Sequence, residues 1–273
     1  MYSIYHFFRH LATNKNALRD AKKLEYFPFA AAMLACRNVG QFPDLAIKMN
    51  HPSGLFTGGE LIELKDSRSY SVASFNSTIP TGQKAIAQII KSENSAIKRQ
   101  MEEAGNHVYS LPIREVFYLV RGRHRGNTKV CLTHGSFFET VKAENLIAQS
   151  FAQVLQERLT EKNLAIGDDL QTALSDIFSE QESFSRGRNL DKASVKLRFR
   201  IMTEVKAEGN ILNSRQYPAL ADNTLNLIVP LHNEDDEKLA RRRFAASGDE
   251  KQFRIFRLKH HLNGYFLVFQ QSW

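Results

Sequence analysis

The residues best suited to chemistry are two carboxylates and a lysine in the segment 41–67. Asp44 follows Pro43 at the start of one apolar run, and Glu63 and Lys65 lie two positions apart in a second run. Side chains two positions apart on a strand point to the same face, so Glu63 and Lys65 are expected to project together. Carboxylates beside a lysine on sheet strands are typical of a site that binds a hard divalent metal ion and handles phosphate.

Two predicted strands must position these side chains. Residues 44–50 alternate between apolar and other residues and form the first strand, and residues 60–66 form the second. The segment between them is rich in glycine and proline and is expected to be a connection. Strict alternation places Glu60 on the face opposite Glu63, which favours a structural role for Glu60.

Further elements surround this hairpin. A helix over 16–38, interrupted at Pro28, precedes it, and a third strand over 69–78, paired next to the second, follows it. Apolar residues at helical spacing predict a long helix from Pro80 to about Ala104, which Gly105 ends. A strand over 114–123 comes next, and the crossover through the helix predicts that it joins the sheet parallel to an inner strand.

The remaining chain alternates between helical and strand patterns. Helices are expected over 137–162 and 168–182, a loop over 184–192, and strands over 193–206, 224–231, 253–259 and 264–269. The charge run at 233–243 predicts a solvated helix or loop. The expected fold class is therefore mixed α/β, in a single domain over 1–273 with a core at 16–121 and an elaboration at 122–273.

Composition and charge limit the classes of protein. Lys and Arg number 37 and Asp and Glu 29, so the net charge is +8, which is compatible with nucleic acid or anionic lipid. Two cysteines cannot form a disulfide framework, and this fits a reducing cytoplasm. The first ten residues show no basic region followed by a clean apolar stretch, so we expect no signal peptide. The longest apolar run, at 27–36, is about half a membrane span, so we expect no membrane association.

Pro43-Asp44 and Glu63-Leu64-Lys65, separated by a gap that suits a hairpin, resemble the signature of the PD-(D/E)xK nuclease superfamily. The order helix–strand–strand–strand–helix–strand over 16–121 resembles the common core of that superfamily, and a chain of this size with added β structure resembles a type II restriction endonuclease. The resemblance implies a restriction-endonuclease-like core with a central mixed sheet flanked by helices. It also implies that Asp44, Glu63 and the backbone carbonyl of Leu64 bind Mg²⁺ and that Lys65 is catalytic.

The activity implied by the resemblance is sequence-specific cleavage of double-stranded DNA by metal-activated water, in a prokaryotic cytoplasm. A homodimer would match the two-fold symmetry of a palindromic site. Two alternatives remain: a structure-specific DNA repair or recombination nuclease of the same superfamily, and a non-catalytic DNA-binding regulator with a nuclease-like fold.

Polar and basic residues outside the hairpin are candidates for DNA contacts, since arginine binds phosphate and reads guanine. Residues 122–273 are accordingly expected to contribute DNA recognition and dimerisation. For each candidate the alternative is ordinary surface hydrogen bonding or solvated charge. The candidates are Asn76, Gln83, Arg121, Arg123, Arg125, Arg186, Arg188, Arg198 and Arg200.

Overall fold

The computed structural model describes residues 3–49, 58–68, 70, 80–90, 92, 94–139, 153–163, 167, 169, 184–190, 193–198 and 212–273, with 184–190 and 193–198 as backbone only. Contacts divide the chain into two compact units. The first unit contains residues 1–72, 81–140 and 207–273, and the second contains residues 73–80 and 141–206. The expected boundary between core and elaboration, at residues 121 and 122, falls inside a strand.

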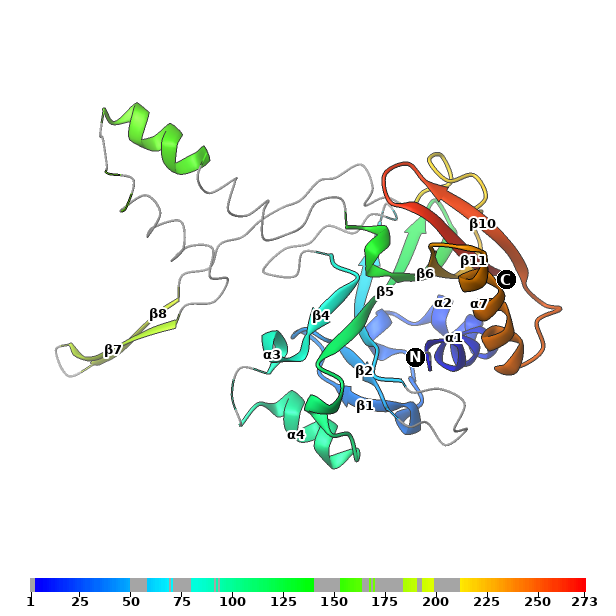
Figure 1. The fold of residues 1–273 in the computed structure, drawn as a ribbon, viewed down its shortest axis with the longest axis horizontal. Helices are drawn as coiled ribbons and strands as arrows, with labels where there is room; N and C mark the ends of the chain where they lie inside the picture. The colour runs from blue at the N-terminus through cyan, green and yellow to red at the C-terminus, as the bar shows by residue number, and fades with distance from the viewer. Residues whose placement is uncertain are drawn as a thin grey trace. The chain divides into compact units, whose positions relative to one another are not determined.

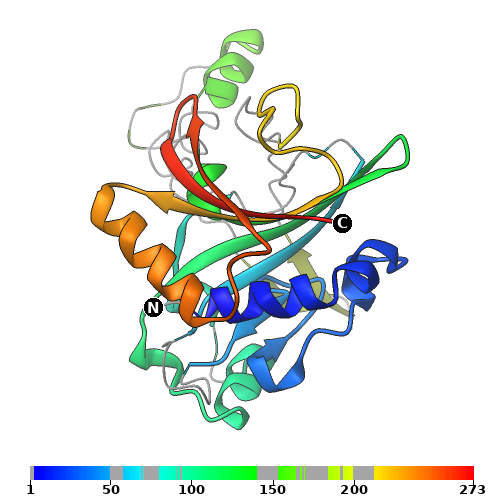
Figure 2. The same ribbon diagram turned by 90° about the vertical axis from the view of Figure 1, so that its right-hand side faces the viewer.

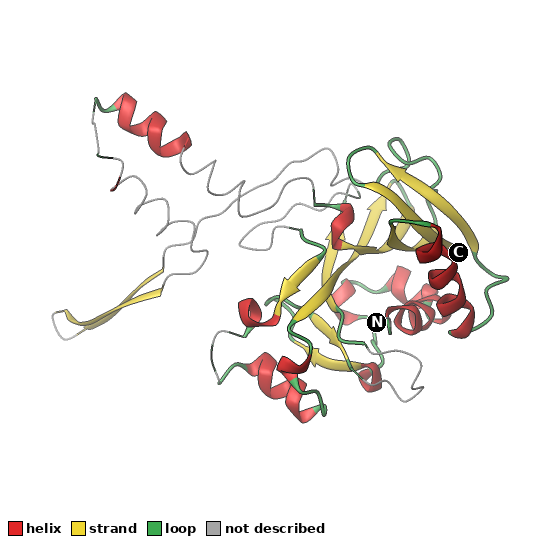
Figure 3. Ribbon diagram, in the orientation of Figure 1, coloured by secondary structure: helices red, strands yellow, loops and turns green. Residues whose placement is uncertain are grey.

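A mixed sheet forms the centre of the first unit (Figures 1 and 3), and within the described residues it has nine strands. Their order is β1-β2-β3-β5-β6-β9-β11-β10, with the short β4 paired to β5. β3 pairs parallel with β5 and β6 pairs parallel with β9, whereas the other pairs are antiparallel. The strands are β1 (Leu34–Arg37), β2 (Leu45–Ile47), β3 (Leu61–Ser67), β4 (Gln83–Ala85), β5 (Ile113–His124), β6 (Asn127–His134), β9 (Thr224–Leu231), β10 (Arg254–His260) and β11 (Gly264–Ser272).

Apolar side chains cover both faces of this sheet. On β5, Phe117 and Leu119 belong to one buried cluster, whereas Val116 and Val120 belong to a second cluster on the opposite face. A strand buried on both faces is expected at the centre of a sheet that contains parallel pairs. The continuous run of β-prone residues in this strand therefore reflects its central position.

Helices cover each face of the sheet. The first cluster includes residues of α1 (Ile4–Thr13), α2 (Lys15–Asp20) and α7 (Glu234–Ala246), with α1 and α7 on the same side of the sheet in Figure 2. Tyr5 of α1 meets Phe244 of α7, with ring centroids 6.2 Å apart. The second cluster includes residues of α3 (Ile86–Ile89) and α4 (Ala96–Glu103). The described part of the chain contains no helix long and apolar enough to cross a membrane.

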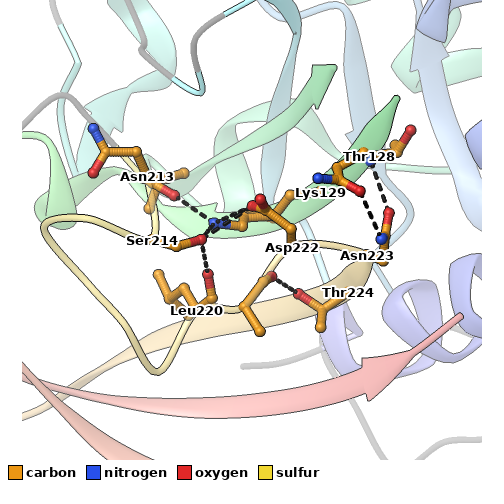
Figure 4. Close-up of polar contacts among 12 residues, drawn as sticks. Thr128, Lys129, Asn213, Ser214, Leu220, Asp222, Asn223 and Thr224 are labelled. Carbon is orange, nitrogen blue, oxygen red and sulfur yellow. Dashed lines mark hydrogen bonds and ion pairs between the residues drawn. The ribbon is translucent and has the colours of Figure 1, made fainter. Parts of the chain in front are cut away.

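A buried lysine joins β6 to the loop that precedes β9 (Figure 4). Lys129 Nζ donates to the Leu212 carbonyl at 3.1 Å and to Ser214 Oγ at 2.8 Å, and it lies 3.3 Å from Asp222 Oδ1. It also lies 4.6 Å from the centroid of the Tyr70 ring. These partners compensate a buried cation that would otherwise be costly, so the loop at 212–223 is held against the sheet.

Several predictions for the core are confirmed. The hairpin strands exist as β2 and β3, and β5 joins β3 in parallel, as the crossover predicted. α4 ends at Glu103, and Gly105 adopts a φ of +81° just beyond it, as expected for a helix stop. The charge run at 233–243 is the helix α7, which Asn233 caps by accepting a hydrogen bond from the Asp236 N–H. The strands expected at 224–231, 253–259 and 264–269 are β9, β10 and β11.

Other predictions about elements are wrong. The helix expected over 16–38 is replaced by α2, two short 3₁₀ turns at Leu24–Tyr26 and Ala31–Met33, and then β1. The long helix expected over 80–104 is replaced by β4, α3 and α4, because residues 83–85 pair with the start of β5. The place expected for a third strand beside β3 is held by β5. Residues 71–78 of that expected strand lie outside the described residues. The order of elements still runs helix, three strands, helix and strand. The three strands are β1, β2 and β3, and the short β4 lies between β3 and the helices that precede β5.

The described part of the second unit contains an antiparallel strand pair, β7 (Phe184–Leu190) with β8 (Ala193–Arg198). The prediction of a loop over 184–192 is therefore wrong, because this segment pairs with β8. The strand expected at 193–206 is confirmed over 193–198. A helix covers 153–161 of the helix expected over 137–162, and residues 135–137 form a 3₁₀ turn.

Candidate functional site

Asp44 lies at the start of β2, directly after the cis peptide bond between Phe42 and Pro43. Its carboxylate is buried and accepts two backbone hydrogen bonds. Oδ1 accepts from the Gly40 N–H at 2.9 Å, and Oδ2 accepts from the Leu64 N–H at 2.8 Å. The second bond holds the carboxylate against the edge of β3, beside the triplet that contains Glu63 and Lys65.

Glu63 and Lys65 project from the same face of β3, as predicted. Lys65 Nζ lies 2.8 Å from Glu63 Oε1 and donates a hydrogen bond to it. The other carboxylate oxygen of Glu63, Oε2, is buried and has no hydrogen-bond partner among the described residues. Lys65 therefore satisfies only one oxygen of a buried carboxylate, and the Asp44 carboxyl group lies close enough to Glu63 to interact with it.

The pKa of Glu63 is raised above its ordinary value. Burial is the main cause, and the neighbouring Asp44 carboxylate adds to it, whereas Lys65 opposes the shift. The Asp44 carboxylate thus disfavours ionisation of the buried Glu63. A bound divalent cation would reverse this balance, since it stabilises both ionised groups at once.

The backbone carbonyl of Leu64 faces the same edge of β3 as Asp44. In a strand, the N–H and C=O of one residue point to the same edge, and the Leu64 N–H donates to Asp44. The Leu64 side chain lies in the opposite core cluster. An apolar residue therefore fits between Glu63 and Lys65 while its carbonyl lies on the strand edge that Asp44 faces.

The donor set fits a hard divalent ion. Two carboxylates and a carbonyl are oxygen ligands, and Mg²⁺ is commonly held by one or two carboxylates while it keeps several waters. The described residues contain no group of three or more His, Cys, Asp or Glu side chains placed to hold a metal ion. Glu25, which could have reached the metal from the helix expected over 16–38, does not form such a group with Asp44 and Glu63. The unpartnered Oε2 of Glu63 is the observation that favours a cation here.

Tyr118 lies next to Glu63 across the parallel β3–β5 pair and was missed by sequence reasoning. It is buried, and burial followed by the Glu63 carboxylate raises the pKa of Tyr118, so the phenol remains protonated. The pairing register that brings Tyr118 to Glu63 depends on a crossover connection. A sequence pattern within one strand does not contain this information.

Arg121 does not lie on the surface as expected. Its side chain is fully buried, and it pairs with Asp66, with Nε 2.7 Å from Oδ1 and Nη2 3.0 Å from Oδ2. Nη1 also donates to the carbonyls of Leu18 and Ala21 at 2.8 Å. The bidentate pair links β3, one residue after Lys65, to β5 and α2. In this structure Arg121 is a structural anchor, and DNA cannot reach its guanidinium.

Three other candidates are placed away from the carboxylates. Arg123 is exposed but donates to the carbonyls of Arg19 and Ala21. Arg125 is exposed at the β5–β6 turn, with a φ of +49°, about 20 Å along β5 from Tyr118 at roughly 3.3 Å per residue. Gln83 donates to Glu115 Oε1 at 3.0 Å. Glu115 and Tyr118 are an odd number of residues apart on β5, so Glu115 lies on the face opposite Tyr118 and Glu63.

The remaining candidates lie outside what the structure describes. Asn76 and Arg200 are outside the described residues, and the side chains of Arg186, Arg188 and Arg198 are not described either. Their proposed contacts with DNA stay predictions.

Glu60 lies on the face opposite Glu63, as alternation predicted. Its carboxyl group is buried near Arg114 and near the backbone N–H groups of Glu60 and Ile4, which favour the ionised form less than burial disfavours it. Burial is the main cause that raises the pKa of Glu60 to about 7.

In comparisons with known proteins, no family model, no curated protein and no solved structure matches this chain.

Proposed function

We propose that this protein is a Mg²⁺-dependent endodeoxyribonuclease of the restriction-endonuclease type, which cuts double-stranded DNA at specific sequences. The observation that carries the proposal is the buried Asp44–Glu63 pair on adjacent strands, with Lys65 on one side of Glu63 and an unpartnered oxygen on the other. The order of helices and strands around the pair and its resemblance to the PD-(D/E)xK pattern support the same activity.

Each residue has a distinct role in the proposed reaction. Asp44 and Glu63 would hold Mg²⁺ together with the Leu64 carbonyl. The bound ion supplies acidification of water and stabilisation of negative charge on phosphate. Lys65 positions the attacking water or stabilises the charge that develops on the phosphate. Asp66 and Arg121 keep the carboxyl end of β3 in place.

Cleavage by single variants tests the catalytic assignment. Plasmid and genomic DNA are incubated with wild-type protein, with and without Mg²⁺, and with Asp44→Asn and Lys65→Ala. We expect discrete fragments from the wild type only with Mg²⁺, and a loss of at least about 100-fold in rate for each variant. Lys251→Ala, which alters an exposed lysine in the loop before β10, serves as the matched control. Full cleavage by either site variant overturns the proposal.

Metal binding has a readout independent of cleavage. Titration with Mg²⁺ or Mn²⁺ should raise the melting temperature of the wild type, because an ion that binds only the folded state stabilises it. Glu63→Gln should lose this response while the protein without metal stays folded. An equal response in Glu63→Gln would place the metal elsewhere.

The same DNA assay separates the alternatives. Discrete fragments from linear duplex support a restriction endonuclease, whereas cutting of forks or mismatches without fixed sequence supports a repair or recombination nuclease. Salt-sensitive binding without any cutting supports a DNA-binding regulator. Measurement of mass in solution tests the proposed homodimer, which would match the symmetry of a palindromic site.

A further inference from the structure

A pocket of about 510 Å³ lies on the opposite face of the sheet from Glu63. Tyr5 of α1 and Leu239 of α7 contribute to its walls, and Glu115, His134 and Ser136 also line it. Glu115 and Phe117 alternate with Tyr118 along β5, so the pocket and the carboxylate pair open on different faces. The pocket is therefore separate from the proposed nuclease site.

Three polar side chains in this pocket form a continuous hydrogen-bonded chain. Ser136 Oγ lies 2.7 Å from His134 Nδ1, and His134 Nε2 lies 2.7 Å from Glu115 Oε2. Glu115 also accepts a hydrogen bond from the Gln83 amide through its other oxygen. A hydroxyl, an imidazole and a carboxylate in this order are the parts of an activated serine nucleophile.

The surrounding hydrogen bonds determine which nitrogen of His134 carries the proton. The Ser136 backbone N–H donates to Nδ1 at 3.3 Å, and a backbone N–H cannot accept. Nδ1 must therefore present its lone pair, and Nε2 carries the hydrogen that is donated to Glu115. The Ser136 hydroxyl consequently faces a basic nitrogen, as a general base requires.

The carboxylate at the end of the chain is ionised. Burial raises the pKa of Glu115, but the hydrogen bonds from His134 and then Gln83 outweigh this and leave the pKa below its ordinary value. An ionised Glu115 fixes the imidazole ring and stabilises the imidazolium that forms when His134 accepts a proton.

Two glycines allow the backbone to hold this chain rigidly. A Cβ at Gly135 would lie 1.8 Å from the Thr81 carbonyl oxygen, and a Cβ at Gly82 would lie 2.9 Å from His134 Cε1. The segment before β4 therefore presses directly on the turn that carries Ser136. The Glu139 carboxylate accepts from the Gly82 N–H at 3.1 Å and fastens the two segments together.

Ser136 is accessible whereas its base is protected. His134 is 6% exposed and packs edge-on against Phe117, with centroids 5.1 Å apart. Ser136 is partly exposed and lines the pocket. A buried base beside an accessible hydroxyl is the arrangement in which a ligand can reach the serine without displacing the histidine.

We infer that Ser136 is a nucleophile that accepts the acyl group of small carboxylic esters bound in this pocket. Ser136 Oγ bonds to the ester carbonyl carbon, and its proton passes to His134 Nδ1. The bond from that carbon to the alcohol oxygen breaks, and the alcohol leaves with the proton. Water then attacks the acyl carbon, gives one proton to Nδ1, and Ser136 recovers that proton as the acid departs. Ester and water become acid and alcohol, with no co-reactant.

The walls of the pocket indicate the class of ester. Apolar side chains of α1, β5, β9 and α7 form one part of the lining, which suits a short aliphatic or aromatic group, and His232, Asp236 and Arg243 add polar and charged groups beside them. The volume lies in the range of small-ligand sites. These apolar residues are Tyr5, Phe117, Val229, Pro230, Leu239 and Ala240.

Covalent labelling tests the inference directly. Wild-type protein is treated with a small alkyl fluorophosphonate, and the intact mass and the labelled peptide are measured. We expect one adduct, at Ser136, none in Ser136→Ala, and labelling at least about 100-fold slower in Glu115→Gln. Ser110→Ala is the matched control, because Ser110 also lies in a 3₁₀ turn but donates to the backbone carbonyl of His107.

Hydrolysis of p-nitrophenyl butyrate gives the second readout. Wild type and Ser110→Ala should hydrolyse it equally, and Ser136→Ala should lose the activity while its melting curve stays close to that of the wild type. Absence of a wild-type adduct, an adduct on another serine, or undiminished hydrolysis by Ser136→Ala overturns the inference. DNA cleavage by Ser136→Ala should remain, so failure here is distinguishable from failure of the proposed nuclease.

Discussion

Replacement of Glu60 by glutamine should change how stability depends on pH. Glu60 is 1% exposed, and the backbone N–H groups of Glu60 and Ile4 stabilise its ionised form only in part. Arg114 lies near it, but the guanidinium of Arg114 donates to the carbonyls of Gly59, Val108 and Leu111 instead. Folding at neutral pH therefore requires either burial of a poorly compensated charge or binding of a proton.

The size of the effect follows from the pKa. Burial raises the pKa of Glu60 from 4.5 to about 7, and a difference of one in pKa corresponds to about 1.4 kcal/mol. Between these two pH values the native state binds more protons than the unfolded state, so stability falls as pH rises. The loss amounts to about 3 kcal/mol and is complete above pH of about 7. Below the pKa that Glu60 has in the unfolded state, the carboxyl group is protonated in both states and this loss of stability is absent.

Urea denaturation of wild type and Glu60→Gln across this pH range measures the effect. The advantage of the variant in free energy of unfolding should grow by about 3 kcal/mol between acidic and mildly alkaline pH. Glu250→Gln, at an exposed position, should show no such growth. A difference between wild type and Glu60→Gln that stays constant with pH would refute the reasoning.

Three further outcomes are expected. Asp66→Ala should lower the free energy of unfolding by about 2 kcal/mol, because it leaves the buried Arg121 guanidinium without its carboxylate; urea denaturation measures this. Gly122→Ala should cost about 2 kcal/mol by the same assay, since a Cβ would lie 1.8 Å from the Tyr70 ring. Cys36 and Cys131 should not react with a thiol reagent near neutral pH until the protein is unfolded, because burial raises their pKa values to about 11 and about 12.

Matched changes serve as controls for these outcomes. Asp20→Ala removes an exposed partner of Arg19 and should leave the melting curve unchanged, and Gly167→Ala adds a Cβ with nothing within 4 Å. Equal losses in these controls and in the core variants would contradict the assigned contacts. Rapid reaction of either cysteine in the native protein would show that the sheet opens locally.

Apart from the parallel pairing of β3 with β5, the confirmed parts of the fold rest on signals that are local in sequence. Glu63 and Lys65 share a face because the strand period is two residues, and the Lys65–Glu63 contact follows from that period alone. The stop at Gly105 is likewise a property of a single turn. Such features need no knowledge of distant partners.

The missed parts depend on distant partners. Residues 83–85 form a strand because they pair with the start of β5, and the helical spacing around them gave no sign of this. Leu34–Arg37 lies in a run with several alanines, and its strand conformation comes from pairing with β2. Arg121 is buried because the parallel register sets it opposite Asp66, and that register is not contained in either strand alone.

The contacts of Lys129 with the loop at 212–223 have a consequence for how this protein can vary. Phe137 lies close to Tyr217, with ring centroids 5.4 Å apart, so the chain leaves the first unit and re-enters it at points that are already joined. The entropy of closing a loop between joined points grows only with the logarithm of its length, about 0.6 kcal/mol per doubling. Extra residues between these two joined points would therefore add little to the entropy of closing the connection.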